Sequence, residues 1–324
     1  MVKIGIIGAG AWGANLVKSS HRLGYLAGVA DRSEDLRASL KISLGEDIPL
    51  FESHAELLAT DVAAVMIATP APTHFQIARE ALFAGKDVFV EKPMTLDPEE
   101  AHELIKIAEE HDRILMVGHL LLFHPPIQKI RQIVAEEKFG SLRSIHQRRA
   151  KLGRARSVEN ALWSLGVHDV AVILYLLGET PDFVSTTGHC GLNADVEDDV
   201  TLHLGFEDGT MANLHVSWLW PKNERHLTLI FERAMLVHDE ISGQLVLYRK
   251  SIDGELQNVD DGEEILSEES MKPLDAEIEH FVHCVSTRTE PLSSGRRSLG
   301  VVEVLSEAEK QLSARRKLDV PLGS

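Results

Sequence analysis

A short apolar run, Val88–Val90, stops at a carboxylate, an ammonium group and a rigid ring: Glu91, Lys92 and Pro93. A lysine at such a strand end can exchange protons near neutral pH if partial burial lowers its pKa. Nearer the start, the chain reads Gly8-Ala9-Gly10-Ala11-Trp12-Gly13, the spacing of loops that bind the pyrophosphate of a dinucleotide. The two segments together predict a nucleotide-binding sheet that presents Lys92 to its ligand. The alternative for Lys92 alone is a surface ion pair with Glu91.

The glycine loop predicts where the nucleotide phosphates bind. Gly8 permits a tight turn after a strand, Gly10 lets the backbone approach the pyrophosphate, and Gly13 lets helix and strand pack closely. The amide groups that begin the following helix would face the phosphates. A glycine turn without a ligand is the alternative. The expected cofactor contacts in this loop are Gly8, Gly10, Ala11, Trp12 and Gly13.

Asp31 ends the second expected strand, eighteen residues after Gly13. A carboxylate at this place accepts hydrogen bonds from the adenosine ribose and repels a 2′-phosphate, so it favours NAD over NADP. Arg32 follows directly, and a guanidinium can pair with a 2′-phosphate or stack on adenine. We therefore expect Asp31 and Arg32 to contact the cofactor, which is NAD, with NADP left open.

The elements that position these residues follow from the hydrophobic pattern. Up to about residue 120, apolar runs alternate with segments of helical period, as in successive βαβ units of a parallel sheet. Ser53 and Thr73 each precede an acid or amide by three residues, the spacing of a capping box, and Asp97 before Pro98 marks another helix start. The expected strands are 2–7, 26–30, 62–68, 87–90 and 114–117.

After about residue 120 the pattern changes. Asp208-Gly209 is a strong hairpin signal between two strand-like runs, and the acidic stretch 253–269 is expected to be solvated. The expected helices are 125–140, 158–178, 275–285 and 299–312, and the expected strands are 201–206, 211–218, 226–231 and 245–249. The predicted fold is α/β: a Rossmann domain over 1–120 and, over 121–324, an α+β substrate-binding and oligomerisation domain with a large, mostly antiparallel, open-faced sheet.

Composition excludes several classes of partner. The 324 residues carry a net charge of -17, so nucleic acid and anionic membranes would be repelled. The basic run 143–156 is either a solvated face or a pocket for a small anion. Only Cys190 and Cys284 occur, far apart, and the 16 histidines show no ligand spacing, so no disulfide framework and no metal site are expected. Without an export signal or a long apolar run, the protein is expected to be cytoplasmic.

Two further segments complete a family pattern: Ala68–His74 follows one expected strand, and Ala81–Val88 leads into the next. With the glycine loop and Glu91-Lys92-Pro93, they resemble the glucose-fructose oxidoreductase / inositol dehydrogenase / MocA family over essentially the whole chain. In that family the strand-end lysine is catalytic, and the preceding acid and the Thr-Pro loop lie near the nicotinamide ribose. The resemblance implies a catalytic role for Lys92 and cofactor contacts by Ala68, Thr69, Pro70, His74, Glu91 and Lys92.

The family also uses a histidine in its second domain, often within an Asp-x-Gly-x-His pattern. Here Ser164-Leu165-Gly166-Val167-His168 matches at the glycine and the histidine, but Ser164 replaces the acid. This departs from the Asp/His proton relay of inositol-type enzymes and leaves Lys92 and His168 as the catalytic pair. His119, which follows a strand, is expected to line the active-site cleft.

A closer resemblance lies in Gly118–Leu121, His124-Pro125, Glu159–Ser164 and Ser217–Leu219. These segments look like the UDP-N-acetyl-2-amino-2-deoxyglucuronate 3-dehydrogenases, which oxidise the C3 hydroxyl of a UDP-linked uronic acid for surface polysaccharides. Guanidinium groups can bind both the carboxylate and the diphosphate of such a substrate. The implied substrate contacts are Arg154, Arg156, Asn160, Trp163, Ser164, His168 and His119.

The predicted function is therefore NAD-dependent oxidation of a sugar secondary hydroxyl, most favourably C3 of a UDP-N-acetylamino uronic acid, with hydride transfer to nicotinamide C4. His168 is the first choice for the base because its ordinary pKa lies near working pH, while Lys92 would hold the alkoxide. The reverse assignment stays open, as do the exact sugar and whether NADH is reoxidised in place. The alternatives are an inositol or free monosaccharide dehydrogenase and a nucleotide-sensing Rossmann protein without turnover.

The assembly is expected to be a homodimer or homotetramer. A hairpin-rich sheet covered by few helices would leave an apolar face that needs a partner. The family resemblance also implies an oligomer formed through that sheet.

Overall fold

The computed structural model describes residues 2–153, 156, 159–266 and 272–319. The chain divides into two compact units: Met1–Phe123 with Met271–Val302, and His124–Ser270 with Glu303–Ser324. The sequence placed one boundary near residue 120 and left everything after it in the second domain. The return of Met271–Val302 to the first unit was not expected, and its physical reason is the helix that this segment contributes to the first core.

The first unit is built on a six-stranded parallel sheet with the order β3-β2-β1-β4-β5-β6. This is the strand order of a dinucleotide-binding Rossmann fold. Its strands are β1 (Ile4–Ile7), β2 (Leu26–Ala30), β3 (Leu50–Phe51), β4 (Ala64–Ile67), β5 (Asp87–Glu91) and β6 (Leu115–Gly118). Its helices are α1 (Gly13–Arg22), α2 (Glu34–Leu44), α3 (His54–Leu58), α4 (His74–Phe83), α5 (Pro98–Glu110) and α8 (Pro273–Thr287), with short turns η1 (Ala71–Thr73) and η2 (Leu120–Phe123).

The three expected helix starts are right in position, but one of the three predicted side-chain caps does not form. Ser53 accepts a hydrogen bond from the Glu56 amide at 3.3 Å, and Asp97 accepts one from the Glu99 amide at 2.9 Å, so both predicted caps are confirmed. The predicted cap at Thr73 is wrong. Its hydroxyl instead bonds the Thr69 hydroxyl at 2.7 Å, because the chain makes a 3₁₀ turn before α4.

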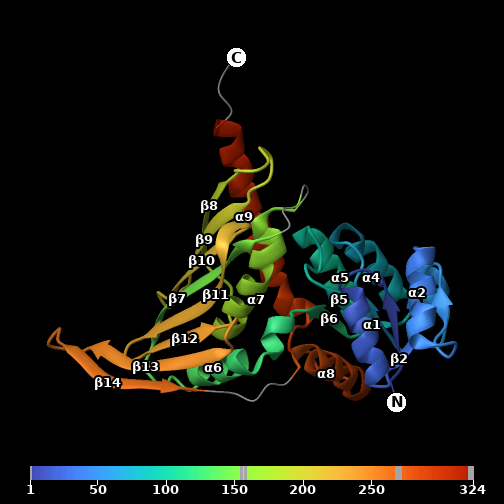
Figure 1. Ribbon diagram of the computed structural model, residues 1–324, viewed down its shortest axis with the longest axis horizontal. Coiled ribbons are helices and arrows are strands. Elements are labelled where there is room, and N and C mark those ends of the chain that lie inside the picture. The colour runs from blue at the N-terminus through green and yellow to red at the C-terminus, as the bar shows by residue number, and fades with distance from the viewer. Residues whose placement is uncertain (1, 154–155, 157–158, 267–271, 320–324) are drawn as a thin grey trace. The chain divides into compact units, whose positions relative to one another are not determined.

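Helix α8 seals one face of this sheet. Phe281 is fully buried and meets Phe89 of β5 edge to face, with ring centroids 5.7 Å apart. Ile278, Cys284 and Val285 join the same buried cluster as residues of β1, β4 and α1. Figure 1 shows α8 beside α1, and residues of the two helices contact each other. The first unit is therefore complete only with a segment that follows the whole second sheet.

The second unit is built on an eight-stranded sheet with the order β14-β13-β12-β11-β7-β10-β9-β8, antiparallel except for the β7–β10 pair. Helix α7 packs on β7 and β10. The strands are β7 (Leu142–Leu152), β8 (Phe183–His189), β9 (Asp199–Gly205), β10 (Met211–Ser217), β11 (Leu219–Phe231), β12 (Met235–Asp239), β13 (Gln244–Ile252) and β14 (Asn258–Ile265). The helices are α6 (Pro125–Ala135), η3 (Leu162–Gly166), α7 (Val167–Leu177) and α9 (Gly295–Asp319), whose residues divide between the units after Val302.

The open face of the second sheet, which we expected to be apolar, is polar over part of its width. In register across β9, β10 and β7, His203, Asn213 and His146 are neighbours, and His215 lies beside Arg148. These positions are half-buried or exposed, whereas the alternate positions of β10 are buried. Strand side chains alternate between faces, so the face away from α7 is polar and rich in histidine along β9, β10 and β7. Across β11, β12 and β13 the same face carries the half-buried Ile230, Val237 and Val246. No helix in the described part of the chain is long and apolar enough to cross a membrane.

Replacing Phe281 with alanine should lower the free energy of unfolding by about 3–5 kcal/mol, because it empties a fully buried site between α8 and β5. Urea unfolding followed by circular dichroism measures the change. The matched control is F183A on β8, where the ring is 55% exposed, and it should change stability by less than about 1 kcal/mol. Equal losses in the two variants would show that α8 does not seal this core.

Candidate active site

The glycine loop leaves space where a pyrophosphate would approach. Gly8 has a φ of 91°, and an added Cβ would lie 2.9 Å from the Ala68 carbonyl. An added Cβ on Gly13 would lie 2.1 Å from the Gly8 oxygen, so helix α1 packs directly on the strand turn. A Cβ on Gly10 would meet nothing within 4 Å. The two outer glycines are thus required by the fold, while Gly10 keeps open the surface that a dinucleotide needs.

Asp31 fixes the glycine loop from the end of β2. Its carboxylate accepts hydrogen bonds from the Ala9 amide at 2.7 Å and the Ser33 amide at 2.8 Å. Each carboxylate oxygen has a further lone pair, so ribose hydroxyls can still donate to Asp31. Arg32 beside it is exposed, and Arg37 binds the Asp31 carbonyl at 2.7 Å.

The sheet register brings the predicted cofactor residues to one edge. Ile7 of β1 pairs with Ala30 of β2 and Ile67 of β4, Ile67 pairs with Val90, and Glu91 pairs with Gly118. The segments that follow these strands are the predicted ones: the glycine loop, Asp31, the Ala68–His74 loop, Lys92 and His119. In an open parallel sheet, this carboxyl edge is where ligands bind.

Glu91 joins the strand end to the glycine loop. Its side chain accepts hydrogen bonds from the Trp12 indole and from the Lys92 amide, the latter at 3.3 Å. Burial raises the pKa of Glu91 to about 7, although the Trp12 hydrogen bond and the charge of Lys92 pull it down. The carboxyl group therefore changes charge near neutral pH, directly beside Lys92, which is half-buried.

His74 supports the loops at the same edge of the sheet. The ring is 1% exposed, and its nitrogens lie 2.7 Å from the Pro93 carbonyl and 2.8 Å from the Thr69 carbonyl. His74 thus ties the Thr-Pro loop to the residue after Lys92. Thr69 is half-buried and Pro70 exposed, so they present surface at the carboxyl edge, whereas His74 supports the loop.

His119 is 4% exposed, and neither ring nitrogen has a hydrogen-bond partner among the described residues. Burial lowers the pKa of His119 to about 3, and the positive charge of Lys92 lowers it further. The imidazole is therefore neutral at working pH. It can accept or donate one hydrogen bond, but it cannot supply a positive charge.

In the second unit, His168 follows a single π-helical turn, η3. Asn160 accepts a hydrogen bond from the Trp163 amide at 3.1 Å and donates to Glu309 at 2.6 Å, so it anchors this turn. An added Cβ on Gly166 would lie 2.7 Å from the Leu162 side chain, which makes the glycine of the motif a packing requirement. Trp163 and Ser164 are buried, and Ser164 donates to the Ala161 carbonyl at 3.3 Å.

A buried network of charged side chains, which begins at the residue after His168, was not predicted from the sequence. Asp169 is fully buried and accepts hydrogen bonds from Arg149 at 2.9 Å and Gln147 at 2.5 Å, while Arg149 also binds Glu240 at 2.7 Å. Burial raises the pKa of Asp169 to about 6. Burial also acts on Glu240, but the charges of Arg149 and Arg225 outweigh it and hold its pKa at about 2. The network ties the start of α7 to β7 and so orients His168.

The signals for this network were the acid directly after His168 and the period-two spacing that puts Gln147 and Arg149 on the same strand face as the buried Ile145. The sequence predicted a solvated face or an anion pocket for the basic run 143–156. In the structure Arg149 is 7% exposed and bound to Asp169 and Glu240. Arg156 pairs with Glu159, and Arg154 lies outside the described residues. Lys92 belongs to the first unit and His168 to the second, and their pairing stays a prediction.

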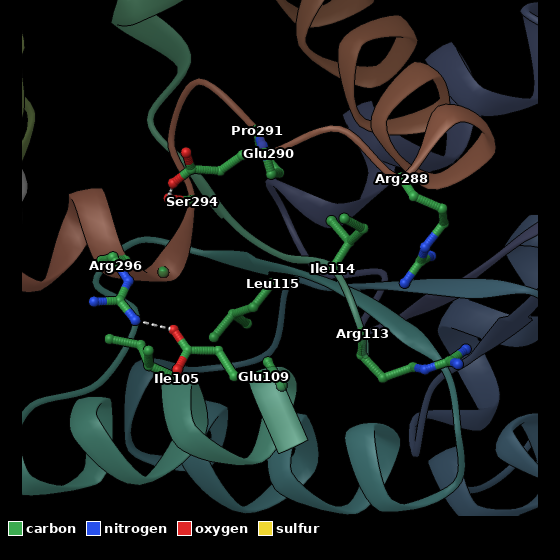
Figure 2. A pocket seen from close by; sticks show the side chains of 12 residues that line it. Ile105, Glu109, Arg113, Ile114, Leu115, Arg288, Glu290, Pro291, Ser294 and Arg296 are labelled. Atoms are coloured by element: carbon green, nitrogen blue, oxygen red, sulfur yellow. Dashed lines mark hydrogen bonds and ion pairs between the residues drawn. The ribbon is translucent and has the colours of Figure 1, made fainter. Parts of the chain in front are cut away.

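A separate pocket of about 290 Å³ lies at the opposite edge of the first sheet, where β6 begins. Figure 2 shows three arginines around it. Arg296 pairs with Glu109, Arg288 with Asp87 at 2.8 Å, and Arg113 binds the Gly85 carbonyl at 3.1 Å. These cations already have partners, so we assign this pocket no function. No cluster of three or more His, Cys, Asp or Glu side chains that could hold a metal occurs among the described residues.

Known families and proteins match the chain along most of its length. The oxidoreductase family model with an NAD-binding Rossmann fold matches residues 2–119, and the GFO/IDH/MocA C-terminal domain matches residues 127–237. The UDP-N-acetylglucosamine 3-dehydrogenase of Acidithiobacillus ferrooxidans is 30% identical, over 91% of this chain and 92% of its own. A solved structure of that enzyme superposes with a TM-score of 0.86 at 29% identity, covering 97% of this chain and 98% of its own. An inositol 2-dehydrogenase of Rhizobium meliloti is 22% identical over 98% of this chain and 99% of its own.

Replacing Gly10 with alanine should weaken NAD binding by about 10-fold or more, because the methyl group would occupy the surface where the pyrophosphate approaches. The melting temperature without nucleotide should be unchanged, since the methyl group meets nothing in the protein. Calorimetric titration and thermal denaturation measure the two effects. The comparison variant G13A should instead lose stability, because its Cβ would collide with Gly8. Full NAD affinity in a folded G10A protein would contradict the assigned phosphate site.

Proposed function

Because the chain belongs to the GFO/IDH/MocA family of NAD-binding oxidoreductases, we propose that it oxidises the C3 hydroxyl of a UDP-linked N-acetylamino sugar. It is an NAD-dependent dehydrogenase acting on CH–OH groups, and the sugar is the part that we propose. The relative that is 30% identical is a UDP-N-acetylglucosamine 3-dehydrogenase, which supports both the nucleotide sugar and the carbon oxidised.

The observation that carries the proposal is the arrangement of residues at the carboxyl edge of the first sheet, where Lys92 lies. The open surface at Gly10, the carboxylate of Asp31 and the half-buried Lys92 lie on segments that leave the same edge of one sheet. These residues fit a bound dinucleotide: Gly10 beside the pyrophosphate, Asp31 at the adenosine ribose, and Glu91 and Thr69 near the nicotinamide end. The bound NAD supplies a hydride acceptor.

The protein residues handle the proton of the substrate hydroxyl. His168 removes it while Lys92 stabilises the alkoxide that develops at C3. The network of Asp169, Arg149 and Glu240 holds the helix that carries His168. The neutral His119 near Lys92 adds no positive charge, and in this proposal Lys92 supplies the charge that stabilises the oxyanion.

The sugar of the substrate is either an N-acetylamino uronic acid or a neutral N-acetylamino sugar. A UDP-N-acetylamino uronic acid presents a carboxylate at C6 and needs a cation there. Arg156, a predicted candidate, already pairs with Glu159, which favours a neutral sugar such as UDP-N-acetylglucosamine as the first substrate to examine. The homodimer or homotetramer that we expected is also a proposal, formed through the open face of the second sheet.

A substrate screen should show NADH formation, followed at 340 nm, with UDP-N-acetylglucosamine or its uronic acid and none with inositol or free glucose. The reason is that the uridine diphosphate supplies binding energy that a free sugar lacks. Faster turnover of the uronic acid would assign the C6 carboxylate a cation in this protein. Turnover of inositol alone would overturn the nucleotide-sugar substrate.

Replacing His168 with asparagine should lower kcat by about two to four powers of ten and leave NAD affinity unchanged, because the base is lost while the glycine loop is intact. Steady-state kinetics on the accepted sugar and NAD titration measure the two effects. H189N is the matched control, since that side chain is 73% exposed in the same unit. Undiminished turnover in H168N would remove His168 from the mechanism.

A further inference from the structure

Glu277 of α8 is a buried carboxyl group for which the proposed mechanism has no use. It is 0% exposed, and neither oxygen has a hydrogen-bond partner among the described residues. A buried polar group without a partner costs about 1–3 kcal/mol, so its presence in the core needs a reason. The helix that carries it is well anchored, because Phe281, one turn later, packs on Phe89 of β5.

The same packing places Glu277 near the carboxyl end of β5. Glu277 and Phe281 lie on one face of α8, four residues apart, and Phe89 and Glu91 lie on one face of β5, two residues apart. The two phenylalanine rings meet, so both carboxyl groups lie on the faces of α8 and β5 that pack together within the first unit, near enough for the charge of Glu91 to act on Glu277. Gly118 closes the other side, where an added Cβ would lie 3.0 Å from a Glu91 oxygen.

The electrostatics agree with this placement. Burial raises the pKa of Glu277 well above its ordinary value, and the charge of Glu91 raises it further. Glu91 therefore ionises first, and Glu277 keeps its proton. Lys92 acts in turn on Glu91 and on the neutral His119. From α1, Arg22 binds Asp275 at the start of α8, and His280 on α8 accepts the Leu292 amide at 2.9 Å, so both are engaged elsewhere.

We propose that Glu91 and Glu277 form a buried carboxyl pair that stores one proton during each cycle of the dehydrogenation, a role that rests on the proposed function. The pair gives up a proton when the positively charged nicotinamide of NAD⁺ lies at the strand end. It regains one when that charge disappears. Glu277 is then a positioning residue: it acts on the charge of Glu91 and touches no reacting atom.

The chemistry balances. Oxidation breaks the C3–H bond, whose hydride goes to nicotinamide C4, and the O–H bond, whose proton goes to the base. The base then gives that proton to solvent. Reduction removes the positive charge of the ring, so the Glu91–Glu277 pair takes up one proton from solvent while NADH is bound and releases one when the next NAD⁺ binds. NAD⁺ binding is therefore linked to proton release and NADH binding is not.

The test measures the affinities of the protein for NAD⁺ and NADH between about pH 6 and pH 9.5 by calorimetric titration, without any sugar. In the wild type, the preference for NAD⁺ over NADH should rise about five- to tenfold as the pH passes through 7, because Glu91 ionises, and should rise further at higher pH. E277Q should keep the first rise and lose the second. E91Q should lose the first rise and move the second to lower pH than in the wild type, because the charge of Glu91 no longer raises the pKa of Glu277, and E91Q/E277Q should show neither.

The matched control is E279Q, an exposed glutamate on the same helix, which should follow the wild type. A second readout needs no cofactor: the melting temperature of E277Q relative to the wild type should increase as the pH rises from about 5 to about 8. Unfolded glutamate ionises near pH 4.5, whereas folded Glu277 stays protonated, so Glu277 lowers the stability of the wild type as the pH rises over this range. E277Q lacks this contribution and keeps only the smaller loss that Glu91 causes.

Three results would overturn the pair: E277Q matching the wild type in both readouts, an NAD⁺ preference that does not vary with pH, or an unaltered pH dependence in E91Q/E277Q. Each of these requires that NAD still binds. Failure of NAD to bind to any variant or to the wild type would instead contradict the proposed function, on which the pair rests.

Discussion

The first unit depends on the carboxylate of Glu91 being buried at the end of β5. The group is 7% exposed, yet it receives the Trp12 indole from the glycine loop and stands beside Lys92. Burial of a charge without compensation is expensive, so these contacts fix the loop and the strand end relative to each other. The nucleotide surface at Gly10 and the lysine are thereby held in one arrangement before any ligand arrives.

The second unit uses the same physical device for a different purpose. Arg149, Asp169 and Glu240 bury their charges between β7, α7 and the end of β12, and every member has a charged partner. Removing one partner from such a network leaves an uncompensated charge, which is strongly destabilising. Because Asp169 is next to His168, its bonds to Arg149 on β7 fix the backbone position of the proposed base relative to the sheet. The two proposed proton-handling residues are each held by buried charge.

The Rossmann unit was largely predictable because its signals are local. Buried parallel strands appear as continuous apolar runs, and Gly8, Gly13 and Asp31 stand at the fixed spacings of one strand–turn–helix–strand unit. Strand β7 was not predicted because its arginines resemble those of a solvated segment. Arg149 can be buried only because the fold brings Asp169 and Glu240, which are distant in sequence, into contact with it. Strand β14 was missed for a related reason, since it is an exposed edge strand with an acidic sequence. Glu277 could not be found from sequence, because an acid on an amphipathic helix ordinarily faces water. Its burial follows from the return of α8 to the first core.

The central claim is that this chain transfers a hydride from C3 of a nucleotide sugar to NAD. The most direct measurement uses UDP-N-acetylglucosamine deuterated at C3, with mass spectrometry of the nicotinamide product. The predicted result is deuterium in the reduced cofactor, together with a slower reaction than with the unlabelled sugar. Reduced cofactor that carries no deuterium would show oxidation at another carbon, and no reduced cofactor at all from this sugar or its uronic acid would contradict the claim.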